Sequence, residues 1–314
     1  MSVRRLRIAF AGFLVLVLVV MGLMVAQVSD DHEVDRIGAR LRRPPSSLRF
    51  EPTMLAGVPE PARRWLLHAI EPGTLLANSV ELELRGARRP EPTSGWRSFH
   101  AGQVLAPPAG FVWRANLRQG ALVWRVAEHY EAGAARVRHA LFGLIPAGSD
   151  RTEVVERSLR ARLVLEAVLV PAALLPAAAV PAGEGDSQAG ADPQRAAAAQ
   201  GPAPLAWQAL DERRARVRLR VDGQEIPLTI EVAPDGRLLA AWVPRPLPAP
   251  LATPETPAGT EVPFGWHIEA EARFDGYTIP ARARGGWWFG SEQYTETLRL
   301  ELVRARFAAP APAP

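Results

Sequence analysis

The chain has 314 residues, no cysteine and a formal net charge of +4, from 37 basic and 33 acidic residues. Without cysteine it can form neither a disulfide framework nor a thiolate metal site. All the basic residues are arginine, and they are interspersed with the acidic residues instead of gathered in runs. We therefore predict no nucleic-acid partner.

The amino terminus has the pattern of a membrane anchor. Arg4, Arg5 and Arg7 precede an uncharged apolar run over residues 8–26, and about twenty such residues span a bilayer core as a helix. Met24 stands where a cleaved signal peptide would have a small residue. Because arginines favour the cytoplasmic side, residues 1–28 predict a cytoplasmic tip and transmembrane helix. The predicted location is the inner membrane, with a single pass and an extracytoplasmic (periplasmic) C-terminal domain.

The rest of the chain divides by composition. Residues 29–57 predict a stem and linker, and residues 58–308 predict one extracytoplasmic α+β domain. Inside that domain, residues 177–204 consist largely of Ala, Gly, Pro and Gln with little to bury, which predicts a disordered insert. Residues 244–263 predict a Pro-rich loop, and residues 309–314 a disordered tail.

Strand patterns occur in two blocks. From Ser79 onward apolar residues recur at every second position, as in Val80, Leu82 and Leu84, which is typical of a strand with one buried face. Similar runs continue over residues 96–145 and resume from Leu205. The connections within each block are short, and parallel neighbours would need a dozen or more linking residues. The pattern therefore predicts about ten antiparallel strands in two blocks.

Between the blocks, the stretch Thr152–Val170 has helical periodicity, with Val155, Leu159 and Leu163 on one face. A long antiparallel sheet that covers an apolar helix face curls around it. The predicted fold is therefore α+β: a curled antiparallel β-sheet, or half-open barrel, packed on a long central helix, with an N-terminal transmembrane helix. A closed barrel or a sandwich with outer helices is the alternative.

Two charged residues interrupt the apolar face of this helix. Arg162 and Glu166 lie in the middle of the face and Ser158 at its edge. One interpretation is an ion pair that fixes the helix to polar groups of the sheet, since a buried carboxylate needs a partner. The other is a polar anchor, inside an apolar groove, for the head of an amphipathic ligand.

Tryptophans supply further candidates for contact with a ligand or a partner. Trp113 and Trp124 fall on the apolar faces of neighbouring strands and are predicted to line the groove. Trp287 and Trp288 are adjacent, so that one faces inward and one outward. An outward tryptophan is a candidate contact with a partner or a membrane, and ordinary packing at the core and rim is the alternative.

No catalytic set is visible. There is no G-x-S-x-G elbow, and the six histidines have no pair at helical ligand spacing. We therefore predict no catalytic residue, metal or cofactor. The leading functional prediction is that the protein binds an apolar or lipid-like ligand. It is also predicted to contact the membrane through residues 8–26. The alternative is a structural or envelope-assembly interaction protein, and the third is an enzyme with an unrecognised site near Glu166.

Several motifs together resemble a known family: PEPARRWLLHAI, FHAGQVL with GFVWRA, RSLRARLVLEAVLVPAALLP, and PFGW with FDGYTIPARARGGWWFG. They resemble an uncharacterised family of bacterial membrane-anchored proteins, a domain of unknown function. The family's Ser-Arg-Glu helix corresponds to Ser158, Arg162 and Glu166, and residues 177–204 look like an addition. The paired strands are also similar to periplasmic lipoprotein-carrier half-barrels, which hold acyl chains between a curved sheet and helices. That resemblance implies an architecture and not a function.

Overall fold

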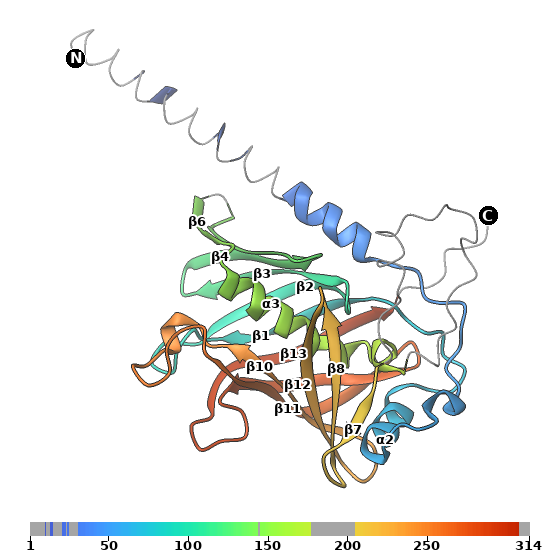
Figure 1. Cartoon of the computed structure of the whole chain (residues 1–314). Coiled ribbons are helices and arrows are strands. Elements are labelled where there is room, and N and C mark those ends of the chain that lie inside the picture. The colour runs from blue at the N-terminus through green and yellow to red at the C-terminus, as the bar shows by residue number, and fades with distance from the viewer. Residues whose placement is uncertain are drawn as a thin grey trace, which may run out of the picture.

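The computed structural model describes residues 31–143, 145–176 and 205–307, with Phe10, Phe13, Leu14, Met21, Gly22 and Met24. The predicted disordered insert (177–204) and tail (309–314) lie outside the described residues. In the described part, the strands form one 13-stranded antiparallel sheet in the order β6-β5-β4-β3-β2-β1-β13-β12-β11-β10-β9-β8-β7 (Figure 1).

The sheet consists of two meanders that meet in its middle. The first contains β1 (Val80–Arg88), β2 (Arg97–Ala106), β3 (Gly110–Gln119), β4 (Leu122–Glu131), β5 (Ala134–Leu141) and β6 (Ile145–Asp150). The second contains β7 (Trp207–Ala209), β8 (Arg214–Val221), β9 (Gln224–Val232), β10 (Leu238–Pro246), β11 (Glu261–Phe274), β12 (Tyr277–Trp287) and β13 (Thr295–Phe307). They join where β1 pairs with β13, from Val80 opposite Phe307 to Arg88 opposite Leu298.

Short turns keep successive strands adjacent. Asp222 and Gly223 connect β8 to β9 with φ of 47° and 78°, and Asp275 and Gly276 connect β11 to β12 with φ of 50° and 86°. Two-residue hairpin turns need this left-handed backbone, which Asp and Gly adopt most readily. The predicted antiparallel blocks thus follow from turn chemistry as well as from alternation.

The curl of the sheet brings its two arms to one helix. Open sheets of more than about ten strands curl because neighbouring strands twist against each other. The α3 helix (Glu153–Glu166) lies in the concavity and contacts β4 and β5 on one arm and β9 and β10 on the other (Figure 1). Leu159, Leu163 and Val164 are buried in this interface. The main hydrophobic core therefore lies between α3 and the inner face of the sheet.

The predicted long central helix over 152–170 is wrong. Thr152 is the N-cap, and α3 ends after 14 residues at Glu166. The chain continues as two short 3-10 helices, η2 (Ala167–Leu169) and η3 (Pro171–Leu174). Pro171 explains the early end, since it has no amide hydrogen and disfavours helical geometry at the residue before it. The fold is an open, curled sheet with short helices.

The predicted transmembrane helix is also contradicted. Among the residues that the structure describes, no helix is long and apolar enough to cross a membrane. Most of residues 8–26, where the span was predicted, lie outside the described residues. The predicted single-pass location in the inner membrane depends on that helix and is contradicted with it.

Smaller helices cover other parts of the sheet. A helix over residues 31–41 packs Val34, Ile37 and Leu41 against Val104 and Val112 on the outer face. After η1 (Pro52–Leu55), α2 (Glu60–Ala69) contacts β7, β8, β9 and β12 at one end of the concavity (Figure 1). The Pro-rich connection between β10 and β11 contains η5 (Ala249–Leu251). The inner face is thus covered by α3 and α2, and part of the outer face by residues 31–41.

Candidate functional site

A cavity of about 340 Å³ lies between α3 and the inner face of the sheet. Strands of both meanders contribute to its wall, so the curl of the sheet creates it. The residues around it are Leu84, Arg88, Arg89, Pro90, Phe99, Gln103, Trp113, Glu128, Ser158, Arg162, Leu165, Glu166, Leu169, Arg245, Pro248, Pro250, Phe264, Trp266, Trp287, Thr297, Leu298 and Leu300. Pro90 and Pro250 are exposed, which places the opening between the β1–β2 and β10–β11 connections.

Most of the wall is aromatic or aliphatic. Phe99 and Trp113 form an edge-to-face pair with ring centroids 5.8 Å apart, and Phe264 and Trp287 form another at 4.8 Å. Trp266 is buried beside them, and its indole nitrogen has no hydrogen-bond partner. Two aromatic pairs on opposite arms of the sheet therefore border the space beneath α3.

A cluster of two buried carboxylates and two partly buried arginines connects α3 to the first meander. Nε of Arg162 donates to Oε1 of Glu166 at 2.7 Å, and Nη1 of Arg162 donates to Oε2 of Glu128, on β4, at 2.5 Å. Arg88 donates to the other oxygen of Glu128 at 3.1 Å. The side-chain amide of Gln103 donates to Oε2 of Glu166 at 2.5 Å. Both carboxylates are therefore bound on both oxygens.

These contacts determine the charge state of Glu128. Burial by itself raises the pKa of this carboxyl, but the positive charges of Arg162 and Arg88 outweigh burial and lower the pKa to about 2. Burial likewise lowers the pKa of Arg162, but Glu166 and Glu128 outweigh it and raise that pKa. Glu128 and Arg162 are therefore both ionised at neutral pH.

Arg245, on β10, faces this cluster from the other arm of the sheet. Its Nε donates to the hydroxyl of Ser158 at 2.9 Å. Its guanidinium lies 4.8 Å from the ring centroid of Phe264 and 5.3 Å from that of Trp287. Burial, followed by the charge of Arg162, lowers the pKa of Arg245 to about 10, so it remains a cation at neutral pH.

The structure brings together most of the predicted site. Ser158, Arg162, Glu166 and Trp113 all line the cavity. Trp287, predicted with Trp288 as a partner or membrane contact, also lies in the cavity wall and is only 6% exposed.

The other two tryptophans lie elsewhere. Trp124 packs partly buried against the core and is absent from the cavity wall, and its indole nitrogen is buried without a hydrogen-bond partner. Trp288 is half-buried just after β12, with φ of 51°.

Arg89 and Thr297 line the cavity and were missed, and so were four polar residues that share one pattern: Arg88, Gln103, Glu128 and Arg245. Each continues the apolar face of its own strand at every second position. Glu128 follows Trp124 and Val126, and Arg245 follows Val243. The sequence signal that could have identified them is a polar residue at a position that the alternation of the strand assigns to its buried face.

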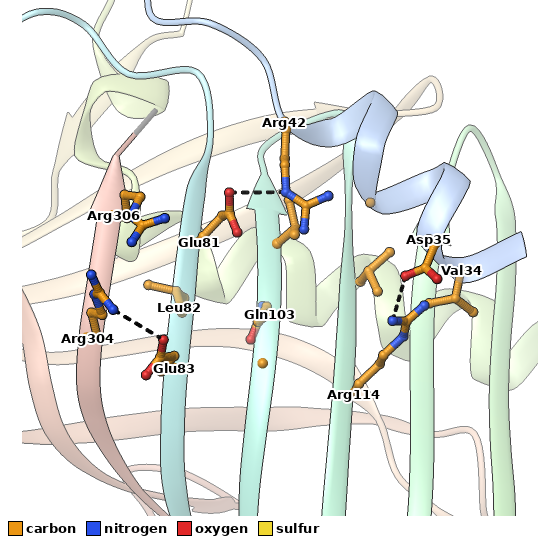
Figure 2. A pocket seen from close by; sticks show the side chains of 14 residues that line it. Val34, Asp35, Arg42, Glu81, Leu82, Glu83, Gln103, Arg114, Arg304 and Arg306 are labelled. Atoms are coloured by element: carbon orange, nitrogen blue, oxygen red, sulfur yellow. Dashed lines mark ion pairs between the residues drawn. The ribbon is translucent and has the colours of Figure 1, made fainter. Parts of the chain in front are cut away.

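A second hollow, of about 250 Å³, lies on the outer face between the helix over residues 31–41 and strands β1, β2, β3 and β13. Figure 2 shows that its charged side chains are largely paired, with ion pairs that join Arg42 to Glu81 at 3.1 Å, Arg304 to Glu83 at 3.8 Å, and Arg114 to Asp35 at 2.7 Å. This hollow has few aromatic or aliphatic walls, so the inner cavity is the stronger candidate for a ligand.

Solved structures that are similar to this chain have low identity and low TM-scores. One is a domain described as that of an outer membrane lipoprotein-sorting protein from Vibrio parahaemolyticus, with 10% identity, 73% of this chain and 85% of that chain covered, and a TM-score of 0.33. Another is a LolA superfamily protein from Nitrosomonas europaea, with 11% identity, coverage of 76% and 88%, and a TM-score of 0.31. A DUF1329 family protein from Desulfovibrio piger has 9% identity, coverage of 74% and 86%, and a TM-score of 0.30.

No curated protein matches the chain. Two family models do, and they divide it between the meanders. Residues 48–189, which include β1 to β6 and α3, match a family of unknown function (DUF6544). Residues 196–307, which include β7 to β13, match another family of unknown function (DUF6920). The chain is thus similar, half by half, to two families of unknown function, which confirms the predicted resemblance to an uncharacterised domain.

Proposed function

We propose that the cavity between α3 and the inner face binds the apolar part of an amphipathic, lipid-like ligand. The observation that carries the proposal is a cavity of about 340 Å³ walled mainly by aromatic and aliphatic side chains. Protein interiors are close-packed and leave few voids larger than a water molecule. Ligand sites are concave, mostly apolar and commonly of about 300–1,000 Å³.

The charged cluster supports this function by holding the cavity in shape. Arg162 connects α3 to β4 through Glu128, and Ser158 connects α3 to β10 through Arg245. The helix is therefore fixed to both arms of the sheet, on either side of the cavity. A site supported in this way is formed before the ligand arrives, which lowers the entropic cost of binding.

A neutral apolar probe tests the proposal without involving charge. N-phenyl-1-naphthylamine, whose fluorescence rises in apolar surroundings, is titrated into the full-length protein. The variant Leu300→Trp puts a larger side chain in the cavity wall. The matched control, Leu122→Trp, makes the same change outside the wall, where the native leucine is 41% exposed.

We expect the wild type and Leu122→Trp to bind the probe equally and Leu300→Trp to bind it at least about tenfold more weakly, which corresponds to about 1.4 kcal/mol. Thermal melts confirm that both variants are folded. The proposal is rejected if the wild type does not bind the probe, or if folded Leu300→Trp binds it as well as the wild type does.

A further inference from the structure

The charges around the inner cavity do not balance. Four arginines line it, Arg88, Arg89, Arg162 and Arg245, against the two carboxylates of Glu128 and Glu166. Arg88 and Arg162 bind Glu128, and Arg162 also binds Glu166. The cavity wall therefore carries an excess of positive charge, which belongs to the other two arginines.

These two arginines differ in what they contact. Arg89 donates to the backbone carbonyls of Glu296 at 2.9 Å and of Pro92 at 3.0 Å, and stacks on the ring of Trp96. It is therefore committed to the β1–β2 connection and to β13. Arg245 has only the hydroxyl of Ser158 as a hydrogen-bond acceptor within the part of the chain that the structure describes.

Arg245 thus keeps most of its hydrogen-bonding capacity. A guanidinium has five N–H donors, of which the one on Nε is used by Ser158 and the four on the Nη nitrogens are left. It lies between aromatic rings, and no carboxylate of the described residues forms an ion pair with it. Burial and the charge of Arg162 outweigh the attraction that Glu128 and Glu166 exert on it through space. A cation in such surroundings is costly until an anion compensates it.

We propose that Arg245 binds the acidic headgroup of an anionic single-chain amphiphile, a carboxylate or a phosphate, whose alkyl chain occupies the cavity. This inference rests on the proposed function and adds the chemical class of the ligand. The planar fork of the guanidinium matches the two oxygens of a carboxylate or phosphate in a bidentate contact. Phe264 and Trp287 flank the guanidinium, so the atoms that follow the headgroup meet apolar walls.

The identity of the headgroup is tested with ligands of equal chain length. Hexadecanoate, hexadecyl phosphate and the neutral hexadecanol compete with N-phenyl-1-naphthylamine for full-length wild-type protein, and inorganic phosphate is tested alone. We expect the two acidic amphiphiles to bind about 10- to 100-fold more tightly than hexadecanol, in line with hydrogen bonds to a charged group. Inorganic phosphate is expected to leave the probe bound.

The variant Arg245→Met assigns that preference to one residue. It removes the charge and keeps a long side chain, and we expect the preference for acidic amphiphiles to disappear while hexadecanol binds as before. The matched control Arg157→Met removes an arginine of α3 that pairs with Glu261 near the surface at 2.8 Å, and it should keep the preference. If Arg245→Met does not fold, Arg245→Lys, which keeps the charge but loses the fork, should weaken the preference severalfold.

The failures of the two proposals are distinguishable. Binding of the neutral probe and of hexadecanol, without preference for the acidic amphiphiles, overturns the assignment to Arg245 and leaves the proposed function intact. A preference that survives in Arg245→Met also overturns it. Displacement of the probe by inorganic phosphate alone would show that the site binds a free anion, and this result overturns the assignment of an amphiphilic ligand. Absence of probe binding overturns the proposed function itself.

Discussion

The ionised carboxylate of Glu128 makes the free energy of unfolding depend on pH, and one substitution isolates this contribution. The substitution Glu128→Gln keeps the size of the side chain and removes its charge. In the folded protein the pKa of this carboxyl is lowered from 4.5 to about 2, by Arg162 and Arg88 acting against burial. A carboxyl with a lowered folded-state pKa stabilises the fold above its unfolded pKa, and this stabilisation is lost as the pH falls through the folded pKa.

The magnitude follows from the two pKa values. The difference between 4.5 and about 2 corresponds to about 3 kcal/mol of stability at pH 7, at 1.36 kcal/mol for each pKa unit. At pH 3 the same linkage leaves about 1 kcal/mol, because the unfolded carboxyl is then mostly protonated while the folded one is still mostly ionised. The gap between wild type and Glu128→Gln should therefore narrow by about 2 kcal/mol between pH 7 and pH 3.

The assay is urea unfolding at a series of pH values from 7 to 3, with the free energy of unfolding extrapolated to water. The matched control is Glu131→Gln, on the same strand, whose carboxylate pairs with the exposed Arg40. An exposed pair contributes up to about 1 kcal/mol, so the control should follow the wild-type pH dependence closely. A gap between wild type and Glu128→Gln that stays constant over this range refutes the reasoning, since the carboxyl would then have its ordinary pKa in the folded protein.

Two further substitutions test a buried hydroxyl and the packing of α3 against the sheet. The hydroxyl of Tyr277 donates to the carbonyl of Leu75 at 2.7 Å and accepts from the amide of Ala77 at 2.8 Å; Tyr277→Phe leaves both backbone groups unpaired and should lower the unfolding free energy by about 1–3 kcal/mol. Leu163→Ala removes a fully buried side chain of α3 and should cost about 2–5 kcal/mol, whereas Val154→Ala, at a position 38% exposed on the same helix, should cost less than about 0.5 kcal/mol. Both are measured by urea unfolding at pH 7, and equal effects of the two α3 substitutions would contradict the burial of Leu163 beneath the sheet.

The local parts of the fold could be predicted from the sequence. Alternation at Val80, Leu82 and Leu84 identified a strand, and short connections identified antiparallel neighbours. The pairing of β1 with β13 could not be predicted in this way, because it joins residues more than two hundred positions apart, and local patterns carry no register between distant strands. The helix was drawn too long because its apolar pattern continues to Val170, although Pro171 prevents helical geometry there.

The candidate site, too, could be predicted only where its contacts are local in the sequence. Arg162 and Glu166 could be paired because they are one helical turn apart on one apolar face. Their contacts with Glu128 and Arg245 depend on the curl that brings β4 and β10 to opposite sides of α3, and no sequence pattern specifies that curl. Trp287 turned inward where a register shift between β12 and β13 falls at Gly285 and Gly286.

The pairing of β1 with β13 makes the middle of the sheet the last part that can be assembled. When a chain is synthesised from its amino terminus, β1 has β2 beside it early, but its other edge stays open until residues 295–307 have emerged. Non-local pairing of this kind slows folding, because the entropy lost in closing a long loop comes before the stabilising contacts between the two strands can form. An open strand edge is also a template for another chain. Assembly of the whole sheet therefore depends on one pairing, between β1 and β13, that forms late. Until it forms, one edge of β1 is unpaired.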